Sequence, residues 1–283
     1  MHHTLHCAGR EITLHRTRVM GILNVTPDSF SDGGCFTGRD RALSHALDMV
    51  RDGADLIDVG GESTRPGSES VSVQEELDRV IPVIEGIVAE TAVPVSIDTS
   101  KPEIMKAAAA AGAGMVNDVF ALRQPNALET AASLGLPVCL MHMRGKPRDM
   151  QSEPVYEDVV AEVLDFLVER AGACEAAGVP SGQVVIDPGF GFGKNLDHNR
   201  ALFRALPRLA GCGYPLLVGV SRKSMFGKIT GRPVDQRISA SVTAAVLAAR
   251  AGAALLRVHD VAETVDALAV FHALTERKGG DSA

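Results

Sequence analysis

The sequence predicts a single (β/α)8 barrel, and three observations support this fold class. Eight short aliphatic runs recur along the chain, and most of them end in polar residues or glycine. Helical patterns lie between these runs, so strands and helices alternate as they do in parallel α/β folds. The eight units together span residues 18–275, which is close to the length of roughly 250 residues that is typical of such barrels.

The predicted strands are nearly continuous in apolar character, which is typical of strands buried on both faces of a parallel sheet. They cover residues 19–26, 56–64, 94–100, 115–119, 137–143, 184–190, 215–224 and 255–260. An open doubly wound sheet usually has five or six strands, and no linker or change in composition marks a second domain. Eight strands therefore favour one barrel over an open sheet.

The predicted helices carry start and stop signals. The first covers 40–52, presents one apolar face and ends at Gly53. Three later helices begin at pairs with the spacing of a capping box: Ser72 with Glu75, Ser100 with Glu103, and Asp260 with Glu263. We expect the longest helix over 156–177 and the seventh over 237–251.

The two ends of the chain are assigned outside the barrel. Residues 1–17 have the pattern of a short hairpin, which we expect to close the N-terminal end of the barrel. The barrel domain is then 18–276, and 277–283 form a flexible tail.

The composition excludes several classes of protein. The net charge is −7 and no stripe of Lys and Arg is present, which argues against a general nucleic-acid binder. No apolar run reaches the 18 or so residues that a membrane helix needs, and the N-terminus lacks the apolar core of a signal peptide. The five cysteines are scattered and odd in number, which is typical of reduced thiols and predicts a cytoplasmic protein.

Polar side chains stand at the end of each predicted strand. In a (β/α)8 barrel these ends all open on one face, which carries the active site. The residues concerned are Asn24, Glu62, Thr64, Arg65, Asp98, Asn117, His142, Asp187, Lys223, Arg257 and His259. Solubility alone does not explain so many polar ends on buried strands, so the set favours a binding site.

Individual residues in or near this set also have simpler explanations. Asp260 is better explained as a helix N-cap than as a ligand, and Asp98 could cap the third helix. His142 is explained equally well as a buried histidine with its hydrogen bonds satisfied. Asp187 and Asp58 could each bind neighbouring backbone groups. These alternatives stay open at the level of sequence.

The segment GFGFGK over 189–194 is similar to a nucleotide-binding loop only at first sight. It matches neither the P-loop pattern, because Asn195 stands where Ser or Thr is needed, nor the dinucleotide pattern of glycines. It also follows the sixth strand instead of the first. The sequence therefore argues against both nucleotide-binding classes. In the loops at 31–34 and 60–67, by contrast, glycine permits close approach of the backbone to a ligand.

The chemistry of the strand ends points to two kinds of ligand group. Asp98, Asn117 and Asp187 with Lys223 supply alternating donors and acceptors, which suit a flat, nitrogen-rich heterocycle. Arg257 and His259 alternate on the eighth strand and share one face, so that with Arg65 they form a corner suited to phosphate. Asn24 offers a hard oxygen, and one such ligand together with diphosphate oxygens is a normal arrangement for Mg²⁺.

At this point the motifs resemble those of the dihydropteroate synthase family of folate-pathway enzymes. The matching segments are GILNVTPDSFSDGG (21–34), DVGGESTRPG (58–67), SIDTS (96–100), VND (116–118), DPGFGFGK (187–194), GVSRKS (219–224) and RVHD (257–260). They cover nearly the whole chain in the order of the family. The resemblance implies a transferase that joins 6-hydroxymethyl-7,8-dihydropterin diphosphate to 4-aminobenzoate, with Mg²⁺ as cofactor.

The resemblance also implies roles for individual residues. Asn24 would bind Mg²⁺, and Asp32 would stabilise positive charge that develops during the reaction. The pterin would be held by Asp98, Asn117, Asp187 and Lys223, with Arg257 packed against it and Met141 beside it. The diphosphate would be bound by Thr64, Arg257 and His259, with Arg65 nearby. The aminobenzoate, and the sulfonamides that compete with it, would be bound by Phe30, Pro66, Phe192, Lys223 and Ser224.

Two other functions remain as alternatives to this transferase. A related pterin-binding barrel moves a methyl group from a reduced folate to a corrinoid partner, but the STRPG and SRKS segments oppose that assignment. A catalytically silent pterin-binding subunit has no chemical need for Asn24, Asp98 and Lys223 together. Family members are commonly homodimers, and by analogy we expect contact through late helices such as 237–251.

Overall fold

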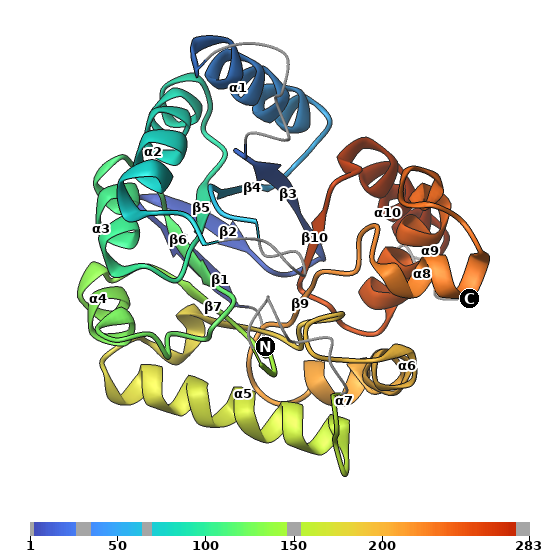
Figure 1. Cartoon of the computed structure of the whole chain (residues 1–283). Coiled ribbons are helices and arrows are strands. Elements are labelled where there is room, and N and C mark those ends of the chain that lie inside the picture. Colours follow the sequence, from blue (N-terminus) through green and yellow to red (C-terminus); the bar gives the residue numbers. More distant parts are fainter. Residues whose placement is uncertain (1–2, 27–34, 64–69, 146–153, 276–283) are drawn as a thin grey trace, which may run out of the picture.

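Eight parallel strands form a nearly closed barrel surrounded by helices (Figure 1). In this computed structural model the described residues are 3–26, 35–63, 70–145 and 154–275. The barrel strands are β3 (Arg18–Asn24), β4 (Leu56–Gly60), β5 (Val95–Asp98), β6 (Met115–Asp118), β7 (Val138–Met141), β8 (Val184–Asp187), β9 (Leu217–Val218) and β10 (Leu255–Val258). Their order is β8-β7-β6-β5-β4-β3-β10-β9, and a parallel bridge between Ile186 and Leu216 links the two outer strands. The predicted (β/α)8 barrel is confirmed.

Each barrel strand is followed by at least one helix. The helices are α1 (Cys35–Arg51), α2 (Val73–Glu90), α3 (Pro102–Ala110), α4 (Ala127–Leu134), α5 (Val159–Ala176), α6 (Leu196–Arg204), α7 (Leu206–Ala210), α8 (Ser224–Thr230), α9 (Ile238–Arg250) and α10 (Val261–Thr275). Short 3-10 helices, η2 (Ser181–Gln183) and η3 (Val234–Gln236), lie in the connections. The connections after β8 and β9 thus contain two α-helices each, where the sequence predicted one.

The structure adjusts several predicted boundaries. Helix α1 begins before the predicted residue 40, and α5 is three residues from the predicted start at 156. The predicted seventh strand over 215–224 shortens to the two residues of β9, because the chain leaves the sheet at Gly219 and turns through Arg222 with φ of +55°. Helix α9 lies within one residue of its prediction at each end.

The predicted capping boxes have different outcomes. Ser72 is the N-cap of α2 and its hydroxyl accepts the Glu75 N–H at 3.2 Å, but the Glu75 carboxylate binds Arg79 instead of returning to the cap. The box predicted at Ser100 is wrong, since α3 begins at Pro102 and its N-cap is Lys101, which makes no side-chain cap. The proline fixes the first turn there, so the helix starts without a polar cap.

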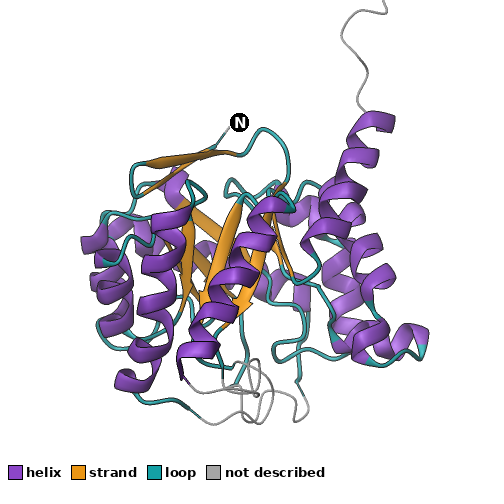
Figure 2. Cartoon of the chain, turned by 90° about the horizontal axis from the view of Figure 1, so that it is seen from above, coloured by secondary structure: helices purple, strands orange, loops and turns teal. Residues whose placement is uncertain are grey.

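The N-terminal hairpin is also confirmed, and it covers the N-terminal end of the barrel (Figure 2). Strands β1 (Thr4–Cys7) and β2 (Arg10–Thr13) pair through a two-residue turn in which Ala8 and Gly9 both have positive φ. Its apolar face packs against side chains at the N-terminal end of the barrel. The residues of the hairpin and the barrel that form this one cluster are Leu5, Cys7, Ile12, Met20, Leu56, Met115, Cys139, Val185, Leu217 and Leu255. Gly114 makes this docking possible, because a Cβ there would lie 2.7 Å from the Cys7 carbonyl carbon.

The described residues bear on two expectations from the sequence, that the cysteines are reduced and that no helix spans a membrane. Cys7, Cys139, Cys174 and Cys212 are free thiols, as the cysteine pattern predicted. Within the described ranges, none of the helices combines the length and the apolar character that crossing a bilayer requires.

Candidate active site

The C-terminal ends of neighbouring strands lie side by side, which places the predicted polar residues around one mouth of the barrel. The strand register pairs Asn24 with Gly60, Gly60 with Asp98, and Asp98 with Asn117. On the other side of the barrel, Asp187 ends β8 and pairs with Met141. Because parallel strands end at one edge, side chains far apart in sequence become neighbours here.

Arg257 is the centre of this cluster. Its Nε donates to Asp58 Oδ2 at 2.6 Å, and its Nη2 donates to Asp98 Oδ2 at 2.7 Å. Burial by itself would lower the pKa of the guanidinium, but the carboxylates of Asp58 and Asp98 outweigh burial and raise the pKa. A guanidinium held by two carboxylates is a fixed, fully charged group in a low-dielectric setting.

Asp98 has a raised pKa of about 7, chiefly because burial disfavours its charged form. Arg257 lowers the pKa, whereas the nearby carboxylates of Asp58, Asp118 and Glu76 raise it. The suggestion that Asp98 caps the third helix is wrong, because its carboxylate turns inward to Arg257 and Lys101 occupies the cap position.

Asp58 is a member of the cluster that sequence reasoning did not assign to the site. It lies on β4 with no exposed surface, and its Oδ2 also accepts from Asn117 Nδ2 at 3.0 Å. The suggestion that Asp58 binds neighbouring backbone groups is therefore wrong. The signal for its role was weak, since a single aspartate inside an apolar run gives no indication of its partner.

Asp187 and Lys223 both lie at the mouth, close enough for each to affect the pKa of the other. The buried Asp187 accepts the Gly189 N–H at 2.8 Å, which agrees with the backbone role suggested for it, while burial raises its pKa and Lys223 opposes that rise. The pKa of Lys223 is lowered to about 8 by burial, against the attraction of Asp187. Its Nζ lies 4.1 Å from the centre of the Phe192 ring, a cation–π contact.

The glycine-rich segment after β8 is held by a buried lysine. Lys194 Nζ contacts His142 Nδ1 at 2.9 Å and donates to the carbonyl oxygens of Gly189 and Phe192 at 2.9 and 3.0 Å. Burial lowers the pKa of Lys194 to about 7, and burial beside this ammonium lowers the pKa of His142 to about 2. His142 is thus a neutral core histidine with a satisfied ring nitrogen, and the lysine fixes the backbone around Asp187 and Phe192.

His259 is positioned by Ser221 on the neighbouring connection. The Ser221 hydroxyl lies 3.0 Å from His259 Nδ1 and accepts the His259 N–H at 3.1 Å. Burial, Arg257 and Arg222 lower the pKa of His259 to about 4, so its imidazole is neutral near pH 7. Asp260 directly precedes α10, where its carbonyl accepts the Thr264 N–H, and its carboxylate binds the Arg222 side chain.

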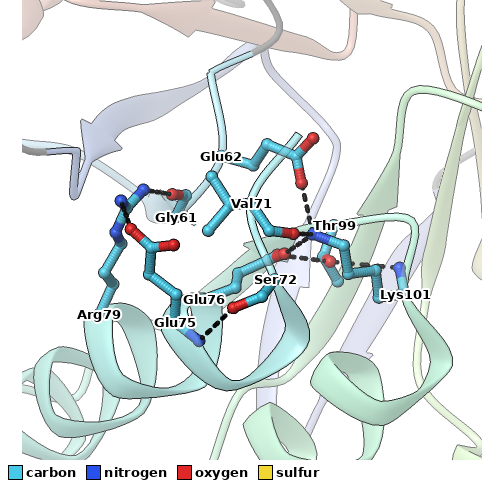
Figure 3. Close-up of polar contacts among 9 residues, drawn as sticks. All are labelled: Gly61, Glu62, Val71, Ser72, Glu75, Glu76, Arg79, Thr99 and Lys101. Atoms are coloured by element: carbon cyan, nitrogen blue, oxygen red, sulfur yellow. Dashed lines mark hydrogen bonds and ion pairs between the residues drawn. The ribbon is translucent and has the colours of Figure 1, made fainter. Parts of the chain in front are cut away.

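A polar network at the rim ties together the two sides of the β4–α2 connection (Figure 3). Lys101 Nζ forms ion pairs with Glu62 and Glu76 and donates to the Val71 carbonyl at 2.8 Å. The buried Glu76 also accepts from Thr99 Oγ1 at 2.7 Å. Burial alone would lower the pKa of Lys101, but its hydrogen bonds with the two glutamates raise it. The network fixes Glu62 and Val71, which flank the predicted residues of that connection.

The remaining predicted residues divide into two groups. Met141 is buried in a small apolar cluster against which Phe192 packs, and Ser224 is exposed at the start of α8. The other five lie outside the described residues: Phe30, Asp32, Thr64, Arg65 and Pro66.

Asn24 at the end of β3 fits the predicted magnesium ligand by its donor chemistry. Its Oδ1 and the Asp98 carboxylate both lie beside Gly60, since a Cβ on that glycine would be 3.9 Å from Asn24 Oδ1 and 3.7 Å from Asp98 Oδ2. Among the described residues, no group of three or more His, Cys, Asp or Glu could hold a metal ion. Any Mg²⁺ here would therefore depend on oxygens from the substrate and water, which is common for this ion.

Comparison with known proteins identifies a consistent set of relatives. Residues 20–259 match the family model described as "Pterin binding enzyme". A dihydropteroate synthase from Escherichia coli K12 is 51% identical over 274 residues, which are 97% of each chain.

Solved structures of such relatives also match the whole fold. Xanthomonas albilineans dihydropteroate synthase with 4-aminobenzoic acid has a TM-score of 0.94 and 58% identity over 98% of this chain and 100% of its own. The same enzyme in complex with 7,8-dihydropteroate has a TM-score of 0.89 and 55% identity, over 97% and 100%. Yersinia pestis dihydropteroate synthase with a sulfonamide drug has a TM-score of 0.91 and 51% identity, over 97% and 99%.

Proposed function

This chain belongs to the dihydropteroate synthase family of pterin-binding enzymes, and on that premise we propose the reaction that it catalyses. It is a transferase that condenses 6-hydroxymethyl-7,8-dihydropterin diphosphate with 4-aminobenzoate, in a Mg²⁺-dependent step of folate biosynthesis. The observation that carries the proposal is the cluster at the strand ends, where Arg257 and Asp98 lie with Asn117, Lys223 and Asp187.

The pterin is bound by the donors and acceptors of this cluster. Asp98 and Asp187 accept from ring or amino N–H groups, while Lys223 donates to a ring oxygen or nitrogen. Burial of both carboxylates supports this role, because N–H donors of a ligand would stabilise their charged forms. Arg257 packs its planar guanidinium against the ring, and Met141 adds an apolar wall.

The diphosphate lies toward Asn24, Thr64, Arg65, Arg257 and His259. His259 contributes a neutral N–H donor, because its lowered pKa keeps the imidazole uncharged near pH 7. Asn24 would hold Mg²⁺ through its amide oxygen, and the bound ion would supply electrostatic stabilisation of the departing diphosphate. Arg257 adds a fixed positive charge that needs no reorganisation during the reaction.

The second substrate binds beside Lys223, where Phe192 supplies an aromatic wall and Ser224 an exposed hydroxyl near its carboxylate. Phe30 and Pro66 complete this part of the site, and sulfonamides compete for it. The aryl amine nitrogen forms a bond to the pterin methylene carbon as the carbon–oxygen bond breaks. The bonding electrons leave with the diphosphate, and the amine loses a proton to water. Asp32 stabilises the positive charge that develops on the pterin.

The protein assembles as a homodimer through its late helices and works in the cytoplasm. Five of the large apolar side chains that are about half exposed or more lie on consecutive elements there, and they are Ile229, Val234, Leu247, Val270 and Leu274; Val155 is exposed elsewhere. Helices α8, α9 and α10 pack side by side (Figure 1), so the elements that carry these residues are neighbours in the structure. Exposed apolar groups concentrated in this way favour a protein–protein contact.

The direct test is to incubate the purified protein with the pterin diphosphate, 4-aminobenzoate and Mg²⁺. Dihydropteroate should form in equal amount with inorganic diphosphate, and chelation of Mg²⁺ should stop both. Binding of the pterin diphosphate without release of diphosphate would instead support a silent pterin-binding subunit. Methyl transfer to a corrinoid without condensation would support the related methyltransferase.

A further inference from the structure

Asp58 occupies the point at which two residues of the candidate pterin site meet. It lies on β4, two residues before the strand end, and it is completely buried. A single oxygen, Oδ2, accepts from Arg257 Nε at 2.6 Å and from Asn117 Nδ2 at 3.0 Å. Its other oxygen, Oδ1, is buried without a hydrogen-bond partner.

The contact with Asn117 settles which way its amide faces. A carboxylate accepts hydrogen bonds and cannot donate them, so the amide nitrogen must face Asp58. The amide oxygen is therefore directed away from Asp58. Among the described residues, the Asn117 side chain makes no other hydrogen bond, which leaves its oxygen and its second N–H to recognise a ligand.

The contact with Arg257 settles the plane of the guanidinium. Asp58 binds Nε and Asp98 binds Nη2, so two carboxylates hold the planar group at two of its nitrogens. The fork geometry of arginine makes such a two-point contact directional. Without Asp58, the guanidinium would rotate about its remaining bond to Asp98.

We propose that Asp58 is a positioning residue for pterin recognition, which orients the Asn117 amide and the Arg257 guanidinium without touching the ligand. The inference rests on the proposed function, because it assigns these two residues to the pterin. The ion pair of Asp58 with Arg257 is by itself weak evidence for stability, because the cost of burying both charges offsets much of their attraction. The Oδ1 atom of Asp58 adds to this cost, since it is buried without a hydrogen-bond partner.

A matched control lies on the next strand. Ser96 pairs with Asp58 in the register between β4 and β5, it is equally buried, and its Oγ also has no hydrogen-bond partner. It contacts neither Arg257 nor Asn117 through a hydrogen bond within the described residues. Ser96→Ala therefore tests whether any change at this level of the barrel disturbs the site.

The experiment measures binding of 6-hydroxymethylpterin by titration calorimetry in the full-length protein. Asp58→Asn keeps the shape but allows the side chain to donate, so that the Asn117 amide can reverse. We expect Asp58→Asn to bind the pterin about 10- to 100-fold more weakly, which is the effect of losing one charge-assisted hydrogen bond to the ligand. Ser96→Ala should bind within about threefold of the wild type. Thermal unfolding monitored by circular dichroism must show that both variants are folded.

Two further measurements separate positioning from general packing. Asp58→Asn should raise the KM for the pterin diphosphate much more than the KM for 4-aminobenzoate. In an Asn117→Ala background, Asp58→Asn should lose part of its effect, because one of the residues it orients is gone. If Asp58→Asn folds poorly, the same pair of measurements on Asp58→Ser replaces it.

The outcomes distinguish this inference from the proposed function. A wild-type protein that binds no pterin would contradict the proposed function itself. A wild-type protein that binds pterin, with an Asp58→Asn variant that binds equally well, would overturn the positioning role. Strict additivity with Asn117→Ala, or equal weakening by Ser96→Ala, would overturn it as well.

Discussion

Replacement of Lys223 by methionine should remove most of the catalytic efficiency, because one ammonium serves both substrates. Its hydrogen bond to the pterin is charge-assisted and contributes about 1.5–3 kcal/mol. Its contact with the Phe192 ring, at 4.1 Å from Nζ to the ring centre, is present without substrate, so it positions the ammonium and does not add to kcat/KM. Loss of the hydrogen bond alone, about 1.5–3 kcal/mol, corresponds to a decrease in kcat/KM of roughly 10- to 160-fold.

The assay is steady-state formation of dihydropteroate with each substrate varied in turn. Lys228→Met is a suitable control, because Lys228 is an exposed lysine on α8, the helix that begins directly after Lys223. It should leave kcat/KM within about twofold of the wild type, as is usual for surface substitutions. Wild-type kinetics in Lys223→Met would refute the placement of both substrates against this ammonium.

The pH dependence of kcat/KM is a second test of the role of Lys223. Burial lowers the pKa of Lys223 to about 8, so its ammonium loses a proton as the pH rises through that value. Only the protonated form makes a charge-assisted hydrogen bond to the pterin, so kcat/KM should fall on the basic side with an apparent pKa near 8. Lys223→Arg should move this fall to a higher pH, because guanidinium stays protonated. If the fall in kcat/KM at high pH stayed at the same pH in Lys223→Arg, it would belong to the titration of another group.

Four further changes have defined expected outcomes. Asn24→Ala should weaken Mg²⁺-dependent binding of the pterin diphosphate in calorimetry, and unchanged affinity would count against the metal role. Gly189→Ala should lower the melting temperature and weaken pterin binding, because φ is +67° there and a Cβ would lie 2.0 Å from the His142 carbonyl oxygen. The neutral, buried His142 has a folded-state pKa lowered to about 2. Stability should therefore fall as the pH drops below the unfolded value near 6.5, by about 1.4 kcal/mol per pH unit for this proton. Urea denaturation at several pH values would measure that slope, and His142→Asn should flatten it. Leu247→Glu should convert a dimer to a monomer in light scattering, and an unchanged mass would exclude this face.

The sequence predicted the strands and their polar ends because both leave local signals. Continuous aliphatic runs mark buried parallel strands, and a change to polar residues marks where each strand leaves the barrel. Asn24, Asp98 and Asp187 are the last residues of their strands in the structure, as those signals indicated. Where packing decides a boundary, local signals failed, as at Ser100, whose expected cap is replaced by Lys101.

The supporting residues could not be predicted because their roles depend on contacts between distant segments. Asp58 binds Arg257, which is 199 residues away, and it lies inside a strand where the pattern predicts only a buried position. Lys194 ends a glycine-rich segment that gives no local sign of its role, although its ammonium holds the backbone of that segment. Both are polar groups whose value comes from the partner that the fold supplies.

The pairing of β3 with β10 also determines when the molecule can finish folding during synthesis. Arg18 at the start of the barrel pairs with Leu255, and Leu5 of the hairpin packs in the same cluster as Leu255. A ribosome that adds about 5–20 residues per second makes these partners roughly 10–50 s apart. Until β10 emerges, the apolar hairpin face and one edge of β3 lack their final neighbours. The hairpin and β3 are therefore made long before they complete their packing, and the barrel closes only after β10 has left the ribosome.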